Sequence, residues 1–393
     1  MTDLHSKVES PSEAPPISEL VRAAGEAVSV KYNNLVYDLK RRGREVIVLS
    51  LGEAFFDVPS VHLDALPPEA NHYSHSRGLP ELRERLASYY QREFGVAVDW
   101  SSEILVTAGS KAAIYFALLA VLDPGDEIIM QEPLWVSYPE QVRLCRGVPV
   151  QIPYDAPLRA FEDRLTARTR GLIVNNPNNP RGRVYTKSEM QYLVDLAKTN
   201  GIYAISDEAY SDFVLGEEFQ SAGLFDEHKS NVIICNSLSK NLGISGWRLG
   251  YVIARAGLID QILKLNQHVI TCAPAPLERF VAASFDDMRA ATRPQIEAVV
   301  EKRAEVASYL DSISLEYLPG TSTFYLFVSI APTKLDSETF CTRLLQESGV
   351  AVVPGIGYGA SCDSFVRVSV GTEPLDAIRI GLDRLKSLVQ RTG

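Results

Sequence analysis

The sequence predicts an α/β fold: a large domain with a mostly parallel central sheet covered by helices, and a smaller α+β domain. Between about residues 100 and 255, short runs of apolar, often β-branched residues alternate with amphipathic helical segments. Strands that are apolar at nearly every position are typical of sheets buried on both faces. After about residue 290 this alternation ends, which favours a second compact domain that combines the C-terminal part with the N-terminal segment.

The expected elements of the large domain follow in chain order. Pro80 suits the first turn of a helix, and Leu82 and Leu86 follow it at helical spacing. Thr186 and Glu189 match a capping box at the start of a second helix. Strands are expected at residues 103–106, 127–130, 171–174, 202–205 and 232–235.

The C-terminal part is expected to contain a long helical stretch, strands at residues 324–330 and 366–370, and a helix around 340–345. A final helix should place Leu375, Ile378, Leu382 and Leu385 on one side. We therefore expect four parts of the chain. They are a mobile segment 1–16, a segment 17–50 that packs on the small domain, a large domain 51–285 and a small domain 286–393.

Composition excludes several classes of protein. The chain has 393 residues, of which 39 are Lys or Arg and 49 are Asp or Glu, for a formal net charge of −10. Because no basic run is longer than residues 40–42, we expect no nucleic-acid partner. The longest apolar stretch, residues 112–122, is too short to cross a bilayer, and the N-terminus has no apolar export signal. We expect a cytoplasmic protein that does not bind membranes.

Cysteine and histidine spacing indicates neither a disulfide framework nor a metal site. The five cysteines never form a C-x-x-C pair, and the six histidines do not make metal-ligand spacing; His72 and His75 are three apart but lie in a loop without acidic companions. P-loop and dinucleotide-binding motifs are also absent. Chemistry is expected instead at the carboxyl ends of the predicted strands, where open α/β sheets bind their ligands.

Two such strand ends carry small or amide side chains. Thr107-Ala108-Gly109-Ser110-Lys111 opens an apolar helix, and free N–H groups there would bind an anion such as phosphate. An ordinary helix cap is the alternative. Asn175-Asn176-Pro177-Asn178-Asn179-Pro180-Arg181-Gly182 closes another strand, and its prolines would hold the loop rigid, although a simple turn also fits.

Three further places carry charged groups in apolar surroundings. Asp207, in Ser206-Asp207-Glu208-Ala209-Tyr210, would need a cationic partner near the buried sheet. Lys240, in Ser237-Leu238-Ser239-Lys240, could lose its charge by desolvation and become a nucleophilic amine. Arg367 lies within a strand and would need an anion, either a substrate carboxylate or a structural partner.

These motifs occur together in the order N-P-N-N-P, D-E-x-Y and S-x-S-K-x-x-x-x-x-G-W-R-x-G, and the chain thereby resembles the class I/II aminotransferases. These are pyridoxal-phosphate enzymes of fold type I, and the resemblance extends from about Ile17 to Leu388. It implies that Lys240 forms the internal aldimine with the cofactor and moves the proton during catalysis. Asp207 would face the pyridinium nitrogen, Tyr210 and Asn179 would bond the phenolic oxygen, and Trp135 would stack on the ring.

The resemblance also assigns the two ends of the site. The phosphate would be bound by Gly109, Ser110, Lys111, Ser237 and Arg248, with Ser239 also among the cofactor-binding residues. Tyr73 would reach the same phosphate from a neighbouring subunit, which implies a homodimer with shared sites. Arg367 would clamp the substrate carboxylate, helped by Asn179 and by the backbone at Gly52.

Three positions depart from the family pattern and leave the substrate open. Arg181 stands where the family has threonine, Ala54 replaces a proline, and Ser322 replaces a glycine. Arg77 or Arg181 could read a distal polar group of the substrate, although surface or dimer contacts are the favoured interpretation of both.

The resemblance implies a ping-pong aminotransferase that moves an amino group between an L-amino acid and a 2-oxo acid. The alternatives are another reaction at the same cofactor, such as β- or γ-elimination or an oxidation, and a non-catalytic regulator that binds pyridoxal phosphate.

Overall fold

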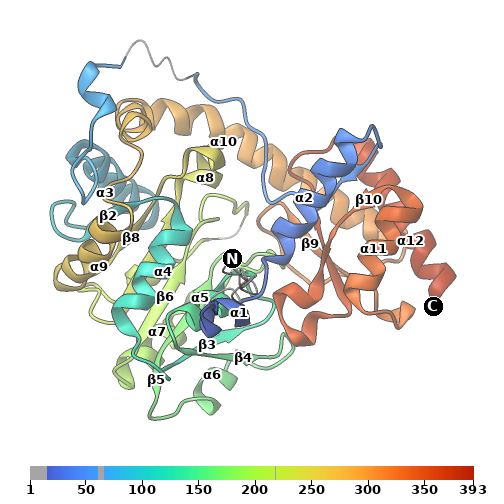
Figure 1. The fold of residues 1–393 in the computed structure, drawn as a ribbon, viewed down its shortest axis with the longest axis horizontal. Coiled ribbons are helices and arrows are strands. Elements are labelled where there is room, and N and C mark those ends of the chain that lie inside the picture. The colour runs from blue at the N-terminus through green and yellow to red at the C-terminus, as the bar shows by residue number, and fades with distance from the viewer. Residues whose placement is uncertain (1–15, 61–65, 217) are drawn as a thin grey trace, which may run out of the picture.

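The computed structural model describes residues 16–60, 66–216 and 218–393, and it shows two bodies of unequal size joined by one long helix, α10 (Ala275–Ser312) (Figure 1). The larger body is built on a seven-stranded sheet and the smaller one on a three-stranded sheet. The expected mobile segment, residues 1–16, lies almost entirely outside the described residues. The predicted α/β class, with a mostly parallel central sheet, is confirmed.

Six strands of the large sheet run parallel, and one runs against them. In spatial order they are β2 (Ile104–Thr107), β8 (Gly250–Ile253), β7 (Val232–Ser237), β6 (Tyr203–Asp207), β5 (Thr169–Asn175), β3 (Glu127–Gln131) and β4 (Val148–Ile152). Only β8 is antiparallel to its neighbours. The carboxyl ends of β5, β6 and β7 therefore meet at one edge, where ligands of such sheets bind.

Helices cover both faces of this sheet, and this explains its apolar strands. Ile128 and Met130 belong to one core cluster, while Ile129 between them belongs to the other. The first face is covered by α4 (Ser110–Val121), α5 (Tyr138–Leu144) and α9 (Ala256–Val269). The second face is covered by α3 (Pro80–Phe94), α6 (Ala160–Asp163), α7 (Lys187–Thr199) and the first part of α10. The capping box of Thr186 and Glu189 is present at the start of α7.

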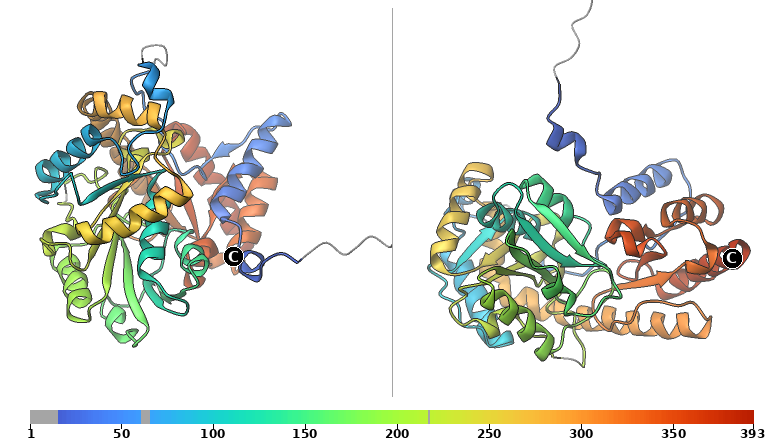
Figure 2. Two further views of the ribbon diagram at one scale, coloured as in Figure 1. Left: turned by 60° about the vertical axis from the view of Figure 1, so that its left-hand side comes forward. Right: turned by 90° about the horizontal axis from the view of Figure 1, so that it is seen from below.

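The smaller body combines both ends of the chain (Figure 2). Its antiparallel sheet has the order β11 (Val353–Pro354), β12 (Phe365–Ser369), β9 (Tyr325–Ser329), and β1 (Ile47–Val48) pairs with β10 (Val350–Ala351). α11 (Ser337–Ser348), α12 (Leu375–Thr392) and the N-terminal α2 (Val28–Arg41) pack around them. The second half of α10 belongs to the same core, so the expected domain boundary at residue 285 falls inside one continuous helix.

Short elements complete the chain. They are α1 (Glu19–Ala23), α8 (Leu238–Asn241) and 3-10 turns at Pro68–Asn71, Ala222–Phe225, Ser245–Trp247, Ala331–Thr333, Gly355–Tyr358 and Ala360–Cys362. Among the described residues, no helix combines the length and the apolar character needed to span a membrane.

Candidate active site

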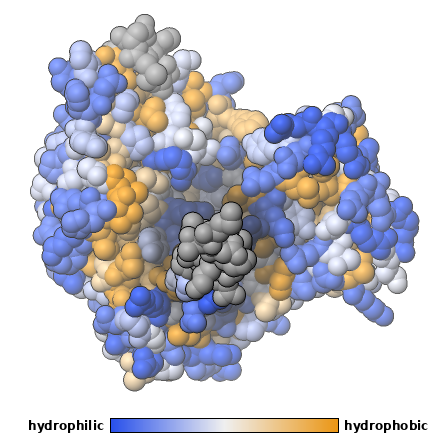
Figure 3. Space-filling model, viewed as in Figure 1, coloured by the Kyte–Doolittle hydropathy of each residue, from blue (hydrophilic) through white to orange (hydrophobic). Residues whose placement is uncertain are grey.

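A cavity of about 340 Å³ lies at the carboxyl ends of the parallel strands and reaches the smaller body. The surface is hollowed between the two bodies (Figure 3). Twelve of the residues predicted for the site line this cavity: Gly52, Ser110, Lys111, Trp135, Asn179, Asp207, Tyr210, Ser237, Ser239, Lys240, Arg248 and Arg367. The strand order therefore brings together side chains that are far apart in the sequence.

Lys240 lies on α8, directly after β7, and its amine points into the cavity. Its Nζ donates a hydrogen bond of 2.5 Å to the carbonyl oxygen of Gly52. Burial lowers the pKa of Lys240 from 10.5 to about 8, and the nearby charge of Glu53 acts in the opposite direction. About a tenth of this amine is therefore uncharged at pH 7, far more than for an ordinary lysine, and the uncharged form is the nucleophile.

Asp207 ends β6 and faces the same cavity. It accepts hydrogen bonds from the Tyr138 hydroxyl at 2.5 Å and from the Ala209 amide at 3.2 Å. Burial raises the pKa of Asp207 to about 6 in spite of these bonds. A cationic group placed against this carboxylate would return its pKa toward the ordinary range.

Three side chains form a polar chain beside Asp207. The Asn179 amide nitrogen lies 3.4 Å from the Tyr210 hydroxyl, which in turn lies 3.0 Å from the Tyr325 hydroxyl. Burial raises the pKa of Tyr210 well above its usual value, so this phenol remains a hydrogen-bond donor at neutral pH. The Asn179 loop is held by a 2.7 Å bond from its own amide to the Asn175 side chain.

Positive charge and free amides gather at the start of α4. Gly109 has a φ of +84°, and a Cβ built there would lie 2.6 Å from Nη2 of Arg248. Burial lowers the pKa of Lys111, and the charge of Arg248 lowers it further. Ser237 accepts a 3.1 Å bond from the Ser239 amide and so caps α8 nearby. This end of the cavity is suited to an anion.

Arg367 lies on β12 of the small sheet and is buried. It donates to the Ser50 carbonyl at 2.8 Å and to the Asn179 side-chain oxygen at 3.4 Å, and it lies over the Tyr325 ring. Its Nε has no partner among the described residues, and no carboxylate of that part of the chain pairs with it. A buried guanidinium with an unused donor is suited to a planar carboxylate.

Three predicted residues lie elsewhere. Tyr73 is 85% exposed and does not reach the cavity of its own chain. Arg77 pairs with Asp260 at 2.6 Å, and Arg181 donates to the Pro319 carbonyl at 2.9 Å. These contacts favour the structural interpretation of both arginines within one chain.

Sequence reasoning missed two tyrosines of the site. Tyr138 is the hydrogen-bond donor to Asp207, and Tyr325 bonds Tyr210 and lies against Arg367. Both could be mistaken for ordinary core aromatics, because each is buried in a cluster of apolar side chains. The sequence feature that could have identified Tyr325 as a site residue is its position in the Ser322-Thr323-Phe324-Tyr325 motif. No group of acidic, histidine or cysteine side chains among the described residues is arranged to hold a metal ion.

The fold and the site define a class of enzyme with a buried lysine and an anion-binding helix start on an α/β sheet. The family model for class I and II aminotransferases matches residues 44–385, so the chain belongs to that family. It is an enzyme, a transferase of amino groups, as the sequence predicts. The family implies a pyridoxal 5′-phosphate cofactor.

Known proteins resemble the chain over nearly its whole length. It is 32% identical to the aspartate/prephenate aminotransferase of Thermus thermophilus over 392 residues, which cover 95% of this chain and 99% of that one. It is 31% identical to the (5-formylfuran-3-yl)methyl phosphate transaminase of Methanocaldococcus jannaschii, covering 91% of this chain and 95% of that one. The solved aspartate aminotransferase from Thermus thermophilus with maleate superposes with a TM-score of 0.88, at 31% identity, and covers 95% of this chain and 100% of that one.

Proposed function

We propose that this aminotransferase holds pyridoxal 5′-phosphate through Lys240 and transfers an amino group between an L-amino acid and a 2-oxo acid by a ping-pong mechanism. The observation that carries the proposal is the placement of Lys240 and Asp207. Asp207 ends β6, Lys240 lies on α8 directly after the neighbouring strand β7, and both side chains face one cavity of about 340 Å³. A buried amine opposite a buried carboxylate suits a cofactor that bears an aldehyde and a basic ring nitrogen.

The remaining side chains fit the other parts of that cofactor. The start of α4 with Gly109 and Ser110, together with Arg248 and Ser237, would hold the phosphate. Tyr210 and Asn179 would donate to the ring oxygen, and Trp135 would stack on the ring. When bound, pyridoxal phosphate supplies an electron-accepting ring and an aldehyde that takes up the substrate's amino group.

The chain's own residues then perform three tasks. Lys240 accepts the proton from the substrate Cα and returns a proton to the product, because burial lowers its pKa to about 8 and so favours both gain and loss of a proton. Arg367 orients the substrate by binding its α-carboxylate with the donor that has no partner among the residues described by the structure. Asp207, fixed by Tyr138, supplies the negative charge that keeps a ring nitrogen protonated.

We also propose that the active form is a homodimer in the cytoplasm. Its support is Tyr73, whose exposed phenol would complete the phosphate site of the partner subunit. The apolar side chains exposed along the N-terminal segment add to this support: Ile17, Val21, Val30, Leu35 and Tyr37.

A screen of half-reactions tests the function. The purified protein with pyridoxal phosphate is mixed with single amino acids, and the released 2-oxo acid is identified by mass spectrometry. By their names, the relatives act on different substrates, so the screen also identifies the donor. We expect stoichiometric 2-oxo acid without ammonia, and none from Lys240→Ala, while Lys264→Ala on the surface keeps the activity. Release of free ammonia in the absence of a second substrate would show that the enzyme catalyses elimination and not transamination.

A further inference from the structure

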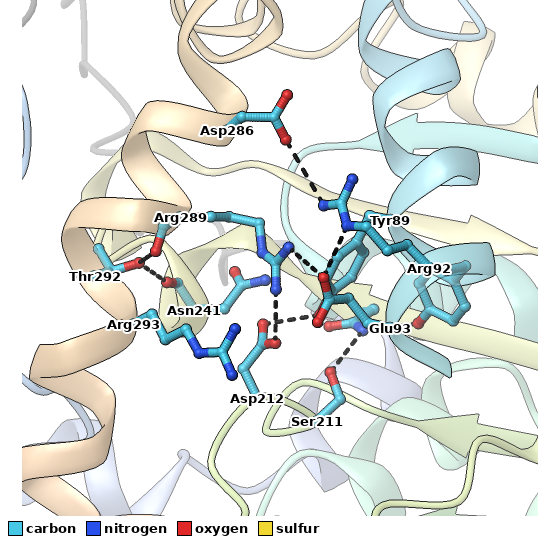
Figure 4. A network of polar contacts seen from close by, with 12 residues as sticks. Tyr89, Arg92, Glu93, Ser211, Asp212, Asn241, Asp286, Arg289, Thr292 and Arg293 are labelled. Atoms are coloured by element: carbon cyan, nitrogen blue, oxygen red, sulfur yellow. Dashed lines mark hydrogen bonds and ion pairs between the residues drawn. The ribbon is translucent and has the colours of Figure 1, made fainter. Parts of the chain in front are cut away.

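One short stretch of α10, residues 289–295, contacts three chain segments that converge on Lys240. Arg289, Thr292 and Gln295 are spaced three residues apart, so they lie along one side of the helix. Each of them binds a different segment. Figure 4 shows the first two of these contacts, with Arg289 between two carboxylates and Thr292 against Asn241.

Arg289 anchors the segment that carries Tyr210. Its guanidinium lies 3.0 Å from Glu93 and 3.5 Å from Asp212, and it sits over the Tyr89 ring at 4.4 Å. Asp212 also accepts a 2.8 Å bond from the Tyr89 hydroxyl. Because Asp212 follows Tyr210 closely in the chain, this ion pair fixes the turn that presents the Tyr210 hydroxyl.

Thr292 anchors the turn that carries Lys240. Its side chain is 1% exposed, and its hydroxyl donates a 2.7 Å bond to the backbone carbonyl of Asn241. The Asn241 amide group is buried and has no partner among the described residues, so it does not fasten the turn itself. α8 is a single helical turn, which makes a bond from outside important for its position.

Gln295 anchors the segment that follows Gly52. Its amide nitrogen donates to the Asp57 carbonyl at 2.9 Å, and its amide oxygen accepts from the Asp57 amide at 2.8 Å. Gly52 accepts the hydrogen bond of the Lys240 amine. The same helix therefore positions the lysine and the segment that includes its hydrogen-bond acceptor.

Building on the proposed function, we propose that Arg289, Thr292 and Gln295 of α10 are positioning residues. They fix the segments that carry Tyr210, Lys240 and Gly52 relative to one another, and Thr292 does so by bonding Asn241, the residue next to Lys240. None of the three lines the cavity that holds the catalytic groups. α10 continues into the small body, where Arg303 donates to the Tyr325 carbonyl at 2.8 Å. The same helix therefore makes hydrogen bonds to the large-body segments and to the backbone of a tyrosine in the small sheet.

The test compares Thr292→Val, which has nearly the same shape and lacks the hydroxyl, with Thr292→Ser, which keeps it. Arg293→Ala is the matched control, because this neighbouring side chain is 73% exposed and pairs only with Glu297 among the described residues. Two readouts are used. The first is kcat and KM of the enzyme loaded with pyridoxal phosphate. The second is the pH dependence of Lys240 acylation in the cofactor-free full chain, followed by peptide mass spectrometry.

We expect Thr292→Val to lower kcat about tenfold, with KM for the amino donor nearly unchanged, because the lost bond displaces the amine rather than the substrate. The acylation midpoint should rise by about half a pH unit or more as the turn opens toward water and away from Asp207, Glu53, Arg248 and Arg367, which face the amine. Thr292→Ser and Arg293→Ala should match the wild type in both readouts.

A Thr292→Val enzyme with wild-type kcat and an unchanged acylation midpoint would overturn the inference, even if its melting temperature fell. If this variant does not fold, Gln295→Met is measured in the same way, and wild-type values for it would overturn the inference as well. Failure of the proposed function would give a different result from failure of this inference. The wild type would then bind no pyridoxal phosphate, while acylation of Lys240 would still report whether Thr292 positions it.

Discussion

In the cofactor-free chain, the buried charge of Asp207 lowers the free energy of unfolding, and the size of this effect depends on pH. Its pKa in the fold is about 6 against 3.8 in the reference state, so the folded chain binds the proton more tightly. Stability from this group is therefore fully present below pH 3.8 and lost as the pH rises through about 6. At neutral pH the cost is on the order of 3 kcal/mol.

We therefore expect Asp207→Asn to raise the free energy of unfolding of the cofactor-free chain at neutral pH by about 1 to 3 kcal/mol, with little gain near pH 4. The same variant should lose transaminase activity. Urea unfolding at several pH values measures the first effect. A variant less stable than the wild type at pH 7 would show that the bonds from Tyr138 and Ala209 outweigh the buried charge.

Arg367 should determine how tightly the enzyme holds the substrate carboxylate. Replacing it by lysine removes the planar pair of donors and leaves a charge of the same sign. We expect kcat/KM for the best amino acid to fall about 100-fold or more, from loss of charge-assisted hydrogen bonds. The control substrate is the corresponding amine without the carboxylate, which should react equally slowly with both enzymes. An equal loss for both substrates would contradict the carboxylate role.

Individual residues were predictable where a charge sits in an apolar context. A charged side chain is costly to bury unless a partner or ligand compensates it. This is why the sequence singles out Lys240, Asp207 and Arg367. Tyr138 and Tyr325 did not stand out, since a buried phenol is ordinary until its hydroxyl is seen to meet Asp207 or Tyr210. Their roles depend on distances between elements, which the sequence does not contain.

At the scale of elements, the turn from β2 into α4 depends on one glycine. A side chain at Gly109 would collide with Arg248, and the φ of +84° disfavours it further. We expect Gly109→Ala to weaken pyridoxal phosphate binding at least tenfold, by about 1.4 kcal/mol or more. Gly201→Ala is the matched control, because Gly201 also has a positive φ (+62°) but no atom within 4 Å of the added carbon. Equal cofactor affinity of the two variants would contradict an anion site at this turn.

The sequence did not predict β4 and β8, and each strand has its own reason. β4 lies at the edge of the sheet, is partly exposed and contains Pro149, so its pattern is weak. β8 begins at Gly250 within the G-W-R-x-G motif, and it runs antiparallel to β7 after a short connection that contains only the single turn α8 and a 3-10 turn. α10 starts earlier than expected, at Ala275, because its first part packs on the large sheet and its second part on the small one.

In the whole molecule, each active site is expected to be completed by a residue of a second chain. Tyr73 is exposed in one chain, while every other predicted cofactor residue lines the cavity or touches a residue that does. We expect Tyr73→Ala to bind pyridoxal phosphate weakly, and Lys240→Ala to be inactive. Mixing the two and allowing subunits to exchange should restore one complete site per hybrid dimer. At limiting cofactor, activity no higher than the sum of the separate variants would contradict shared sites.

All of the proposed chemistry depends on a covalent bond between the Lys240 amine and the cofactor. Reduction of the loaded enzyme with borohydride makes this bond permanent, so that digestion and mass spectrometry can locate it. We expect the added mass of pyridoxal phosphate on Lys240 and its loss in Lys240→Ala. The added mass on any other lysine, or none on the wild-type chain, would contradict it.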